Sequence, residues 1–399
     1  MNLSIYKSRY IFIVCVFTLF TFGLIMLYST SSPKFGQVMF KKQIVYCIIG
    51  CIVAFFLQFP SYKRLEKYAT VILITIIVPL LYLVLANFLY KKGIDLQLPL
   101  TGGKATKGSF RWLKLGFLSI QPSEFLKIGV FFFLSSYYAA KQRYVQRFWK
   151  GFLLPFGIAG FAALTVLLGG DLSMTVITTF IVIIVGFVAG VRVRFLTLVL
   201  LLGVVGVITI AHLSPERFSR FKTYQVPEKY PRGDGYQLWL SELALGSGGF
   251  SGIGFTNSRM KELYLPDAHT DFILAIIGEE LGFIGISFVM LLYLGLLAGA
   301  VGISINATDR LGTYLGCGCA SAIFLSAFFN IGVVCGYLPT TGITAPLLSY
   351  GGSNMMSTFI CIGLLLNIAR QSILEIEGTP HSLKELKIGY TIHEQPKES

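Results

Sequence analysis

Long apolar runs separated by short polar connections fill almost the whole chain. A helix needs about 20 apolar residues to cross a hydrocarbon core about 30 Å thick, and these runs approach or exceed that length. The predicted spans are 10–28, 43–59, 68–90, 122–140, 151–168, 172–190, 195–211, 271–293, 312–335 and 354–369. The pattern therefore predicts an all-α polytopic membrane protein with about ten transmembrane helices.

Composition supports this class. The 399 residues are 54% hydrophobic and only 13% charged, which excludes an ordinary soluble domain. The first run has no small-residue cleavage site and further spans follow it, so we interpret it as a mature helix rather than a signal peptide. The seven cysteines lie in apolar runs without metal-ligand spacing, which favours small buried residues. The chain carries no nucleic-acid motif, and no nucleic-acid partner is expected.

The distribution of lysine and arginine predicts how the chain crosses the membrane. Three short connections between spans are basic: 60–67, 141–150 and 191–194. Short basic loops stay in the cytoplasm, and an even number of spans then places both termini there. The large loop 212–270, between the seventh and eighth spans, is predicted to be extracytoplasmic. We predict one transmembrane domain over 1–370 and a flexible cytoplasmic tail over 371–399, which is polar and contains two prolines.

The predicted outer loops are also rich in lysine and arginine, and the formal net charge is +14. One interpretation is attraction to anionic lipid headgroups. The other is that the outer face handles an anionic substrate, such as a phosphorylated lipid.

The stretch YLPDAHTDFILAIIGEELG, at 264–282, combines acidic residues with the start of a span. Asp267, His269 and Asp271 fall within five positions, directly before the sequence becomes apolar. Thr270 is a candidate helix cap, and Asp271 stands where the helix is expected to begin. A carboxylate there is either a simple cap or a functional group at the mouth of a cavity.

Further along this helix the sequence predicts packing roles. Gly278 and Gly282 form a small-xxx-small pair that lets another helix approach closely. Glu279 and Glu280 lie about 12–14 Å beyond Asp271, at 1.5 Å per residue. They cannot share one face with Asp271, so we expect at least one to bind a neighbouring helix.

A second stretch, 108–127, reads GSFRWLKLGFLSIQPSEFLK. Arg111 suits an interfacial position where its guanidinium reaches phosphate. Pro122 fits the first turn of a helix. Glu124 and Lys127 are three residues apart and can pair on one face, either as a structural ion pair or as part of a polar substrate cavity. Farther along the chain, Asp171 is predicted to cap the sixth span.

The third stretch, 336–353, reads GYLPTTGITAPLLSYGGS and contains no charge. Such a segment reaches membrane depth only where it is buried in protein or lines a cavity. Backbone N–H groups at Gly351 to Ser353 precede the last span and form a candidate anion site, with Ser349 nearby. A plain glycine-rich turn is the alternative.

These stretches resemble the SEDS family (shape, elongation, division and sporulation). Five stretches run in the family's order over nearly the whole chain: 23–31, 110–127, 235–255, 264–282 and 336–354. The combination of RW…QPSE..K with HTDF…GEELG is very specific. The AHTDFI.AIIGEELGFIG form and the LLLNIAR ending are more similar to the FtsW division branch than to the RodA elongation branch.

The resemblance implies a ten-span fold with cytoplasmic termini and a peptidoglycan glycosyltransferase activity. It implies polymerisation of lipid II, the undecaprenyl-pyrophosphate-linked disaccharide peptide, outside the cytoplasmic membrane. A class B penicillin-binding protein and other divisome proteins at the septum are the implied partners. The essential family aspartate corresponds to Asp271, and Arg111, Glu124 and Lys127 correspond to substrate-cavity residues. This chain has Asp267 where the family usually has glutamate, and GGDLS at Asp171 where PDLG is usual.

We therefore predict Asp271 to be the general base that deprotonates the acceptor hydroxyl. Five cations are candidates to neutralise the leaving pyrophosphate: Arg111, Lys114, Lys127, Arg259 and Lys261. No cofactor is required by the pattern, although Mg²⁺ or Mn²⁺ between Asp267, Asp271 and phosphate is a further hypothesis. The remaining substrate-binding candidates are Glu124, Asp267, His269, Thr270, Ser349 and Ser353. A lipid II flippase and a scaffold without chemistry of its own are the alternatives.

Overall fold

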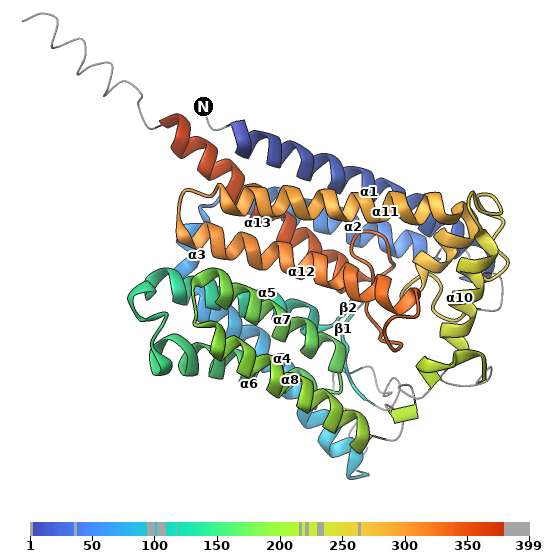
Figure 1. Cartoon of the computed structure of the whole chain (residues 1–399), viewed down its shortest axis with the longest axis horizontal. Helices are drawn as coiled ribbons and strands as arrows, with labels where there is room; N and C mark the ends of the chain where they lie inside the picture. Colours follow the sequence, from blue (N-terminus) through green and yellow to red (C-terminus); the bar gives the residue numbers. More distant parts are fainter. Residues whose placement is uncertain are drawn as a thin grey trace, which may run out of the picture.

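The computed structural model describes residues 3–35, 38–93, 100–101, 109–116, 118–214, 218–219, 223–229, 235–261 and 265–378. In this part of the chain the protein is almost entirely helical, and its long helices run side by side along the long axis (Figure 1). The predicted stretch 108–127 lacks its first residue and residue 117 in this description, and the stretch 264–282 begins at residue 265.

The elements follow the predicted order. The first half contains α1 (Leu3–Phe35), α2 (Val38–Leu57), α3 (Tyr62–Leu65), η1 (Glu66–Tyr68), α4 (Ala69–Lys91), α5 (Pro122–Ala140), α6 (Leu154–Leu168), α7 (Leu172–Ala189) and α8 (Val193–Leu213). The second half contains α10 (Tyr236–Gly248), α11 (Ile273–Ile305), α12 (Arg310–Val334) and α13 (Gly352–Gly378). Short η segments cover Gln142–Tyr144, Phe148–Leu153 and Pro227–Lys229. A small antiparallel hairpin joins β1 (Leu113–Leu115) to β2 (Leu118–Ile120), with Lys114 opposite Ser119.

Among the described residues, nine helical segments are long and apolar enough to cross a membrane. The one predicted span that is missing from these nine segments, 122–140, corresponds to α5. This helix has 19 residues but carries Glu124 and Lys127 in its first two turns. It packs against α4, α7 and α12 inside the bundle. The prediction of a polytopic all-α membrane protein with about ten spans is confirmed.

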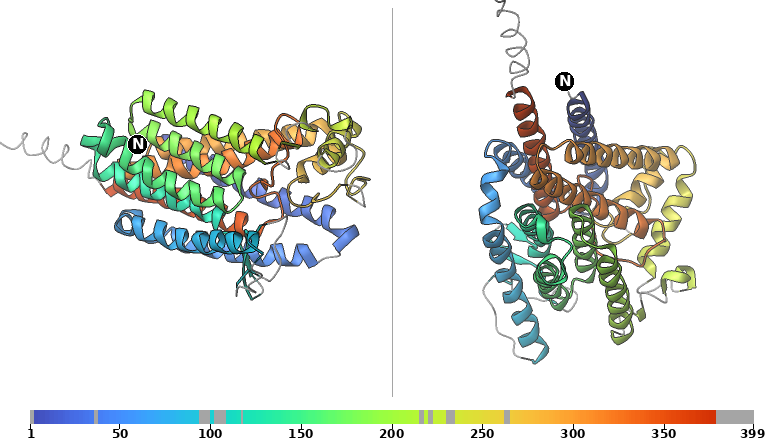
Figure 2. Two further views of the ribbon diagram at one scale, coloured as in Figure 1. Left: turned by 90° about the horizontal axis from the view of Figure 1, so that it is seen from below. Right: turned by 60° about the vertical axis from the view of Figure 1, so that its left-hand side comes forward.

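The two ends of the bundle differ. At one end, here called the terminal end, the Tyr6 hydroxyl of α1 donates to Glu377 of α13 over 2.5 Å, so both ends of the described chain meet there (Figure 1). The other end, the hairpin end, carries β1, β2, α10 and the segment 337–351. Figure 2 shows α4 and α8 at the outer edge of the bundle. Cytoplasmic placement of the terminal end stays a prediction.

The last helix corrects the predicted start of the tail. α13 continues to Gly378, eight residues into the range that the sequence predicts to be flexible from Gln371. Tertiary contacts hold this extension, because Gln371 accepts a hydrogen bond from Ser61 and Glu375 forms an ion pair with Lys63. The remainder of the predicted tail, 379–399, lies outside the described residues.

The uncharged segment 337–351, here called the excursion, enters the helix bundle, which favours the prediction of a segment at membrane depth over a plain glycine-rich turn. The Tyr293 hydroxyl, in the interior of α11, donates to the carbonyl of Pro346 over 2.6 Å. Gly23 of α1 lies so close to the carbonyl of Leu347 that a Cβ there would collide with it. The stretch from Ile343 to Ser349 is therefore largely buried in protein, as irregular backbone at membrane depth must be, whereas Tyr337 and Gly342 are exposed.

α11 is interrupted at Gly282, where φ is +64° and ψ is −157°. The loop 249–254 supplies hydrogen bonds around the break: N–H groups of Ile253 and Gly254 donate to Glu279 and Glu280 carbonyls, each over 3.0 Å. Phe283 N–H in turn donates to Gly249 over 2.9 Å. Gly282 does permit a close approach, as predicted, but the approaching backbone is the loop at Phe250 and Gly252 rather than another helix, and the glycine also permits the break in α11. Gly278 does sit at a close approach, against Leu245 of α10.

Candidate functional site

Asp271 lies in a tight turn that leads into α11. The carbonyl of Asp267 accepts hydrogen bonds from the N–H groups of Thr270 and Asp271 over 3.1 Å each, and Asp267 itself has a φ of +54°. The helix begins at Ile273, and its cap position, Phe272, makes no side-chain cap. The prediction that Thr270 caps the helix is therefore wrong: its hydroxyl donates to the Asp267 carbonyl over 3.1 Å and closes the turn.

Three elements converge on Asp271. Its backbone carbonyl accepts from the Asn330 amide of α12 over 2.7 Å, and the same amide donates to the carbonyl of Ile343 over 2.7 Å. A Cβ placed on Gly342 would lie 3.6 Å from the carboxylate oxygen Oδ2 of Asp271. The carboxylate is half-buried at the hairpin end, beside the backbone of the excursion.

The other polar groups of this turn contact different neighbours. The carboxylate of Asp267 accepts a hydrogen bond from Gln237 of α10 over 3.3 Å. The carbonyl of His269 accepts from the Tyr350 N–H over 2.8 Å, and the two rings are 5.8 Å apart. His269 therefore links the turn to the excursion, and Asp267 links it to α10.

A second polar cluster lies at the start of α5. Lys127 Nζ is 2.7 Å from Glu124 Oε2, and both side chains are almost fully buried. Ser357 of α13 donates to the same carboxylate oxygen over 3.3 Å. The predicted pairing of Glu124 with Lys127 is confirmed, and the predicted placement of Pro122 in the first turn of this helix is confirmed as well.

Asp171 joins α7 to this cluster. Its carboxylate accepts from the N–H of Met174 over 3.1 Å, which confirms the predicted cap, and from the Ser123 hydroxyl over 3.0 Å. Burial raises the pKa of Asp171 above its usual range, although the Arg111 guanidinium and these hydrogen bonds oppose the shift. Arg111 is half-buried and donates from Nε to Ser109 over 3.0 Å.

Both candidate serines have structural partners. The Ser353 hydroxyl accepts from the N–H of Gln121 over 2.8 Å, and the Ser349 hydroxyl accepts from the N–H of Ala345 over 2.9 Å. Each is only 3% exposed. The predicted anion site before α13 is also engaged at Gly351, whose N–H donates to Gln43 over 3.2 Å. These groups shape the backbone around the site. Their contact with substrate stays a prediction.

The predicted cations have different fates. Lys114 on β1 and Arg259 are exposed. Lys261 is buried: its Nζ lies 2.7 Å from Glu280 Oε1 and donates to Ser29 over 2.9 Å. The prediction that Lys261 neutralises a pyrophosphate is wrong, because a buried carboxylate already compensates its charge.

The adjacent glutamates of α11, Glu279 and Glu280, bind groups of the loop that precedes this helix. Glu280, besides Lys261, accepts from Ser29 of α1 over 2.8 Å. Glu279 accepts from the hydroxyl of Ser258 and from the N–H of Arg259, the latter over 3.2 Å. Both carboxylates thus bind neighbouring segments, as the sequence predicts for at least one of them.

Several site residues escaped the sequence reasoning. Asn330 and Gln43 are each 1% exposed and connect the excursion to α12 and α2, and Gln121 joins β2 to α5 and α13. A signal was present for two of them, because an amide inside an apolar span is costly unless it has partners.

The geometry suits chemistry on an anionic, membrane-bound molecule. A half-buried carboxylate stands at one end of the bundle, and Lys114 and Arg259 are exposed cations in the segments before α5 and α11. Among the described residues no group of three His, Cys, Asp or Glu side chains could hold a metal ion. Asp267 and Asp271 are two hard ligands from one turn, so a divalent ion there would need further oxygens from substrate or water.

The chain matches the family model described as "Cell cycle protein", named for FtsW, RodA and SpoVE, over residues 9–373. It is 36% identical over 366 residues to stage V sporulation protein E of Bacillus subtilis, covering 90% of this chain and 96% of that protein. It is 35% identical over 369 residues to the probable peptidoglycan glycosyltransferase FtsW of Coxiella burnetii, covering 90% and 95%.

Two solved structures share the fold. A chain from a study of a peptidoglycan synthase complex that coordinates polymerization and crosslinking superposes with a TM-score of 0.70 at 25% identity, covering 90% of this chain and 97% of that chain. The rod shape determining protein RodA of Thermus thermophilus superposes with a TM-score of 0.66 at 25% identity, covering 90% and 96%. Sequence and fold point to the same family.

Proposed function

We propose, from the premise that this chain belongs to the cell cycle protein family of FtsW, RodA and SpoVE, that it is a peptidoglycan glycosyltransferase. Its substrate is lipid II, which it polymerises into glycan strands at the outer face of the cytoplasmic membrane. The observation that carries the proposal is Asp271, a half-buried carboxylate held at the hairpin end between the turn, α12 and the excursion.

Asp271 acts as the general base. The acceptor sugar hydroxyl attacks the anomeric carbon of the donor, its proton passes to the Asp271 carboxylate, and the bond from that carbon to the pyrophosphate breaks. The undecaprenyl pyrophosphate leaves with the electron pair of that bond. A carboxylate fixed at headgroup level needs no reorganisation for this step, because its turn is held by hydrogen bonds from Thr270 and Asn330.

Exposed cations and the polar cluster at the start of α5 bind the diphosphate of the donor. Lys114 and Arg259 are exposed and supply positive charge for a phosphorylated headgroup, and Arg111 contributes from beside Asp171. The Glu124–Lys127 pair forms part of the polar wall of the substrate cavity. If Mg²⁺ or Mn²⁺ takes part, Asp271 and Asp267 would hold it, and it would supply charge neutralisation for the departing diphosphate.

A flippase has less support. That interpretation depends on the broken segment 336–353 and on two acidic groups inside the bundle, Glu279 and Glu280, which would contact a translocating headgroup. Glu280 is compensated by Lys261, and Glu279 accepts hydrogen bonds from the loop at Ser258 and Arg259. Both carboxylates are buried and occupied by these partners.

The proposed partner is a class B penicillin-binding protein. This assignment is supported by one structural neighbour, which comes from a peptidoglycan synthase complex. We assign the chain to the division branch, with other divisome proteins at the septum, because several relatives are named FtsW. A fluorescent fusion enriched at the septum supports this branch, whereas side-wall localisation would place the chain in the elongation branch.

The deciding experiment replaces Asp271 with Asn, which keeps the size of the side chain and removes its basicity. Purified protein is given labelled lipid II and its partner, and glycan-strand length is measured on gels. We expect synthesis to fall by roughly 10²–10⁴-fold, the usual contribution of a general base, with unchanged thermal unfolding.

Asp309→Asn is the matched control, because Asp309 caps α12 at the terminal end. We expect it to retain polymerisation. Full activity of Asp271→Asn would exclude the base assignment. Polymer made by the partner alone would reduce the chain to a scaffold, and lipid II transport without polymer would favour the flippase.

A further inference from the structure

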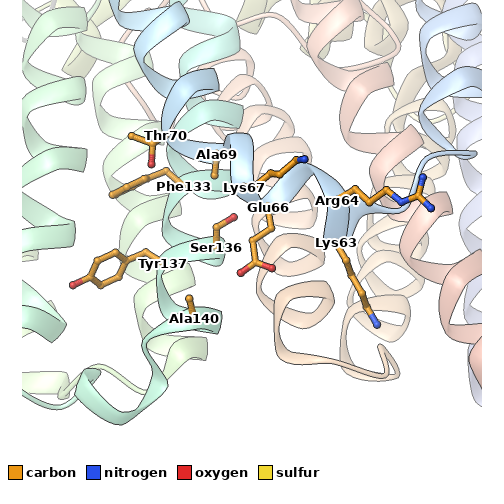
Figure 3. Close-up of a pocket in the computed structure, with 10 residues that line it drawn as sticks. All are labelled: Lys63, Arg64, Glu66, Lys67, Ala69, Thr70, Phe133, Ser136, Tyr137 and Ala140. Atoms are coloured by element: carbon orange, nitrogen blue, oxygen red, sulfur yellow. The ribbon is translucent and has the colours of Figure 1, made fainter.

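A cavity of about 570 Å³ opens at the terminal end, at the far end of the bundle from Asp271. It lies between α5 and the segment that contains α3, η1 and the start of α4 (Figure 3). Its polar lining residues are Lys63, Arg64, Glu66, Lys67, Thr70, Ser136 and Tyr137. Nothing in the proposed polymerase chemistry uses this cavity.

One buried hydroxyl in the lining has no partner. Ser136 is 7% exposed, and its Oγ makes no hydrogen bond within the described chain. On α12, by contrast, Ser321 and Ser326 donate back to the carbonyl four residues earlier, over 2.7 and 2.9 Å. Figure 3 shows the Ser136 hydroxyl directed from α5 toward Glu66. A buried hydroxyl without a partner in the chain leaves one hydrogen bond for a water or a ligand to make.

The cations that line the cavity differ in whether a carboxylate pairs with them. Lys63 is compensated, because its Nζ lies 2.9 Å from Asp309 and 2.6 Å from Glu375. Arg64 and Lys67 are exposed, and within the described residues neither has a carboxylate within ion-pair distance. Glu66 is the opposing charge in the lining, so the cavity presents two uncompensated cations against one carboxylate.

We propose that this cavity binds a phosphate group, and that the source is the headgroup of an anionic phospholipid at the membrane surface. Arg64 and Lys67 supply charge, and the Ser136 hydroxyl donates a hydrogen bond to a phosphate oxygen. Basic pockets between transmembrane helices on the cytoplasmic side bind such headgroups, and the sequence predicts that this end faces the cytoplasm. A guanidinium and a hydroxyl also match the two kinds of donor that phosphate accepts.

The test uses the full chain in nanodiscs of phosphatidylcholine with and without phosphatidylglycerol, and measures retained phosphatidylglycerol by native mass spectrometry. We expect Arg64→Gln combined with Lys67→Gln to weaken phosphatidylglycerol retention roughly tenfold or more, because each of the two cations strengthens binding to an anionic headgroup. Ser136→Ala should weaken it several-fold. Glu66→Gln should strengthen it, because it removes the opposing carboxylate.

The matched control is Lys141→Gln with Arg143→Gln, two exposed cations that lie just after α5 and do not line the cavity. An equal loss in this control would overturn the proposal in favour of diffuse attraction to the whole basic end. No change in Ser136→Ala and Glu66→Gln would overturn it too. Displacement of the lipid by inorganic phosphate at low concentration would keep the phosphate site but assign its source to soluble phosphate.

Discussion

Two buried lysine–glutamate pairs have the same separation of 2.7 Å between Nζ and Oε, yet arise in different ways. Lys127 and Glu124 are three residues apart on α5, so the helix itself brings them together. Lys261 and Glu280 are 19 residues apart, on a loop and on α11. Only the folded arrangement of that loop makes them partners.

The comparison shows that a charge has no fixed role until its surroundings are known. By sequence, Lys261 looks like Arg259 two positions earlier, a cation in a predicted outer loop. In the structure Arg259 is exposed, whereas Lys261 is buried and holds the loop to α11 and to Ser29 of α1. The local pair organises one helix end, and the distant pair joins three segments.

The largest expected effect comes from breaking the distant pair. Glu280→Gln leaves the Lys261 ammonium buried without a counter-charge, which costs about 3–5 kcal/mol. We expect a lower unfolding temperature in detergent and faster hydrogen exchange over the loop 249–261. Glu124→Gln breaks the local pair in the same way and serves as the control: it should destabilise the protein without loosening that loop.

An unchanged exchange rate over the loop in Glu280→Gln would show that the pair is incidental to the junction. Conversely, Lys261→Met combined with Glu280→Leu should recover much of the stability, because an apolar pair of similar volume avoids the desolvation of two charges.

A smaller effect is expected from the backbone at the same junction. Gly282→Ala forces a side chain into a backbone region that is essentially restricted to glycine, at a cost of about 1–3 kcal/mol. The new Cβ would also meet the backbone of the loop at Gly252. Gly206→Ala on α8, where an added Cβ meets nothing within 4 Å, is the control. Equal unfolding temperatures for the two variants would mean that the break in α11 carries no strain.

The smallest effect concerns Asp171, which lies near the local pair and senses the charge of Glu124. Its pKa is raised above the ordinary 3.8, so the folded state holds its proton more tightly than the unfolded state. Its contribution to the free energy of unfolding is therefore full below about pH 4 and is lost as pH rises through the folded pKa.

Asp171→Asn removes this titration. As pH rises from about 4 toward 7, the unfolding temperature of the parent should fall relative to that of Asp171→Asn, because only the parent loses this contribution. A difference that shifts toward the parent over that range would show that the hydrogen bonds and Arg111 outweigh burial.

Much of the site's local structure was predictable from short stretches of sequence. Pro122 in the first turn of α5, the Asp171 cap and the Glu124–Lys127 pair all depend on residues within a few positions of each other. The missed features depend on distant contacts. Thr270 closes a turn rather than capping a helix, because the carbonyl of Asp267 lies within reach of its hydroxyl.

The spans could be predicted from the sequence alone, because burying a helical backbone in hydrocarbon requires a long apolar run wherever the chain crosses. The sequence also indicated Asp271 as the acidic residue just before a helix. Three features became visible only in the fold: Gly282 breaks α11, Glu280 compensates Lys261, and Asn330 holds the turn of Asp271 against the excursion. Apolar length and helical spacing act within one segment, whereas a polar group at depth takes whichever distant partner the fold brings to it.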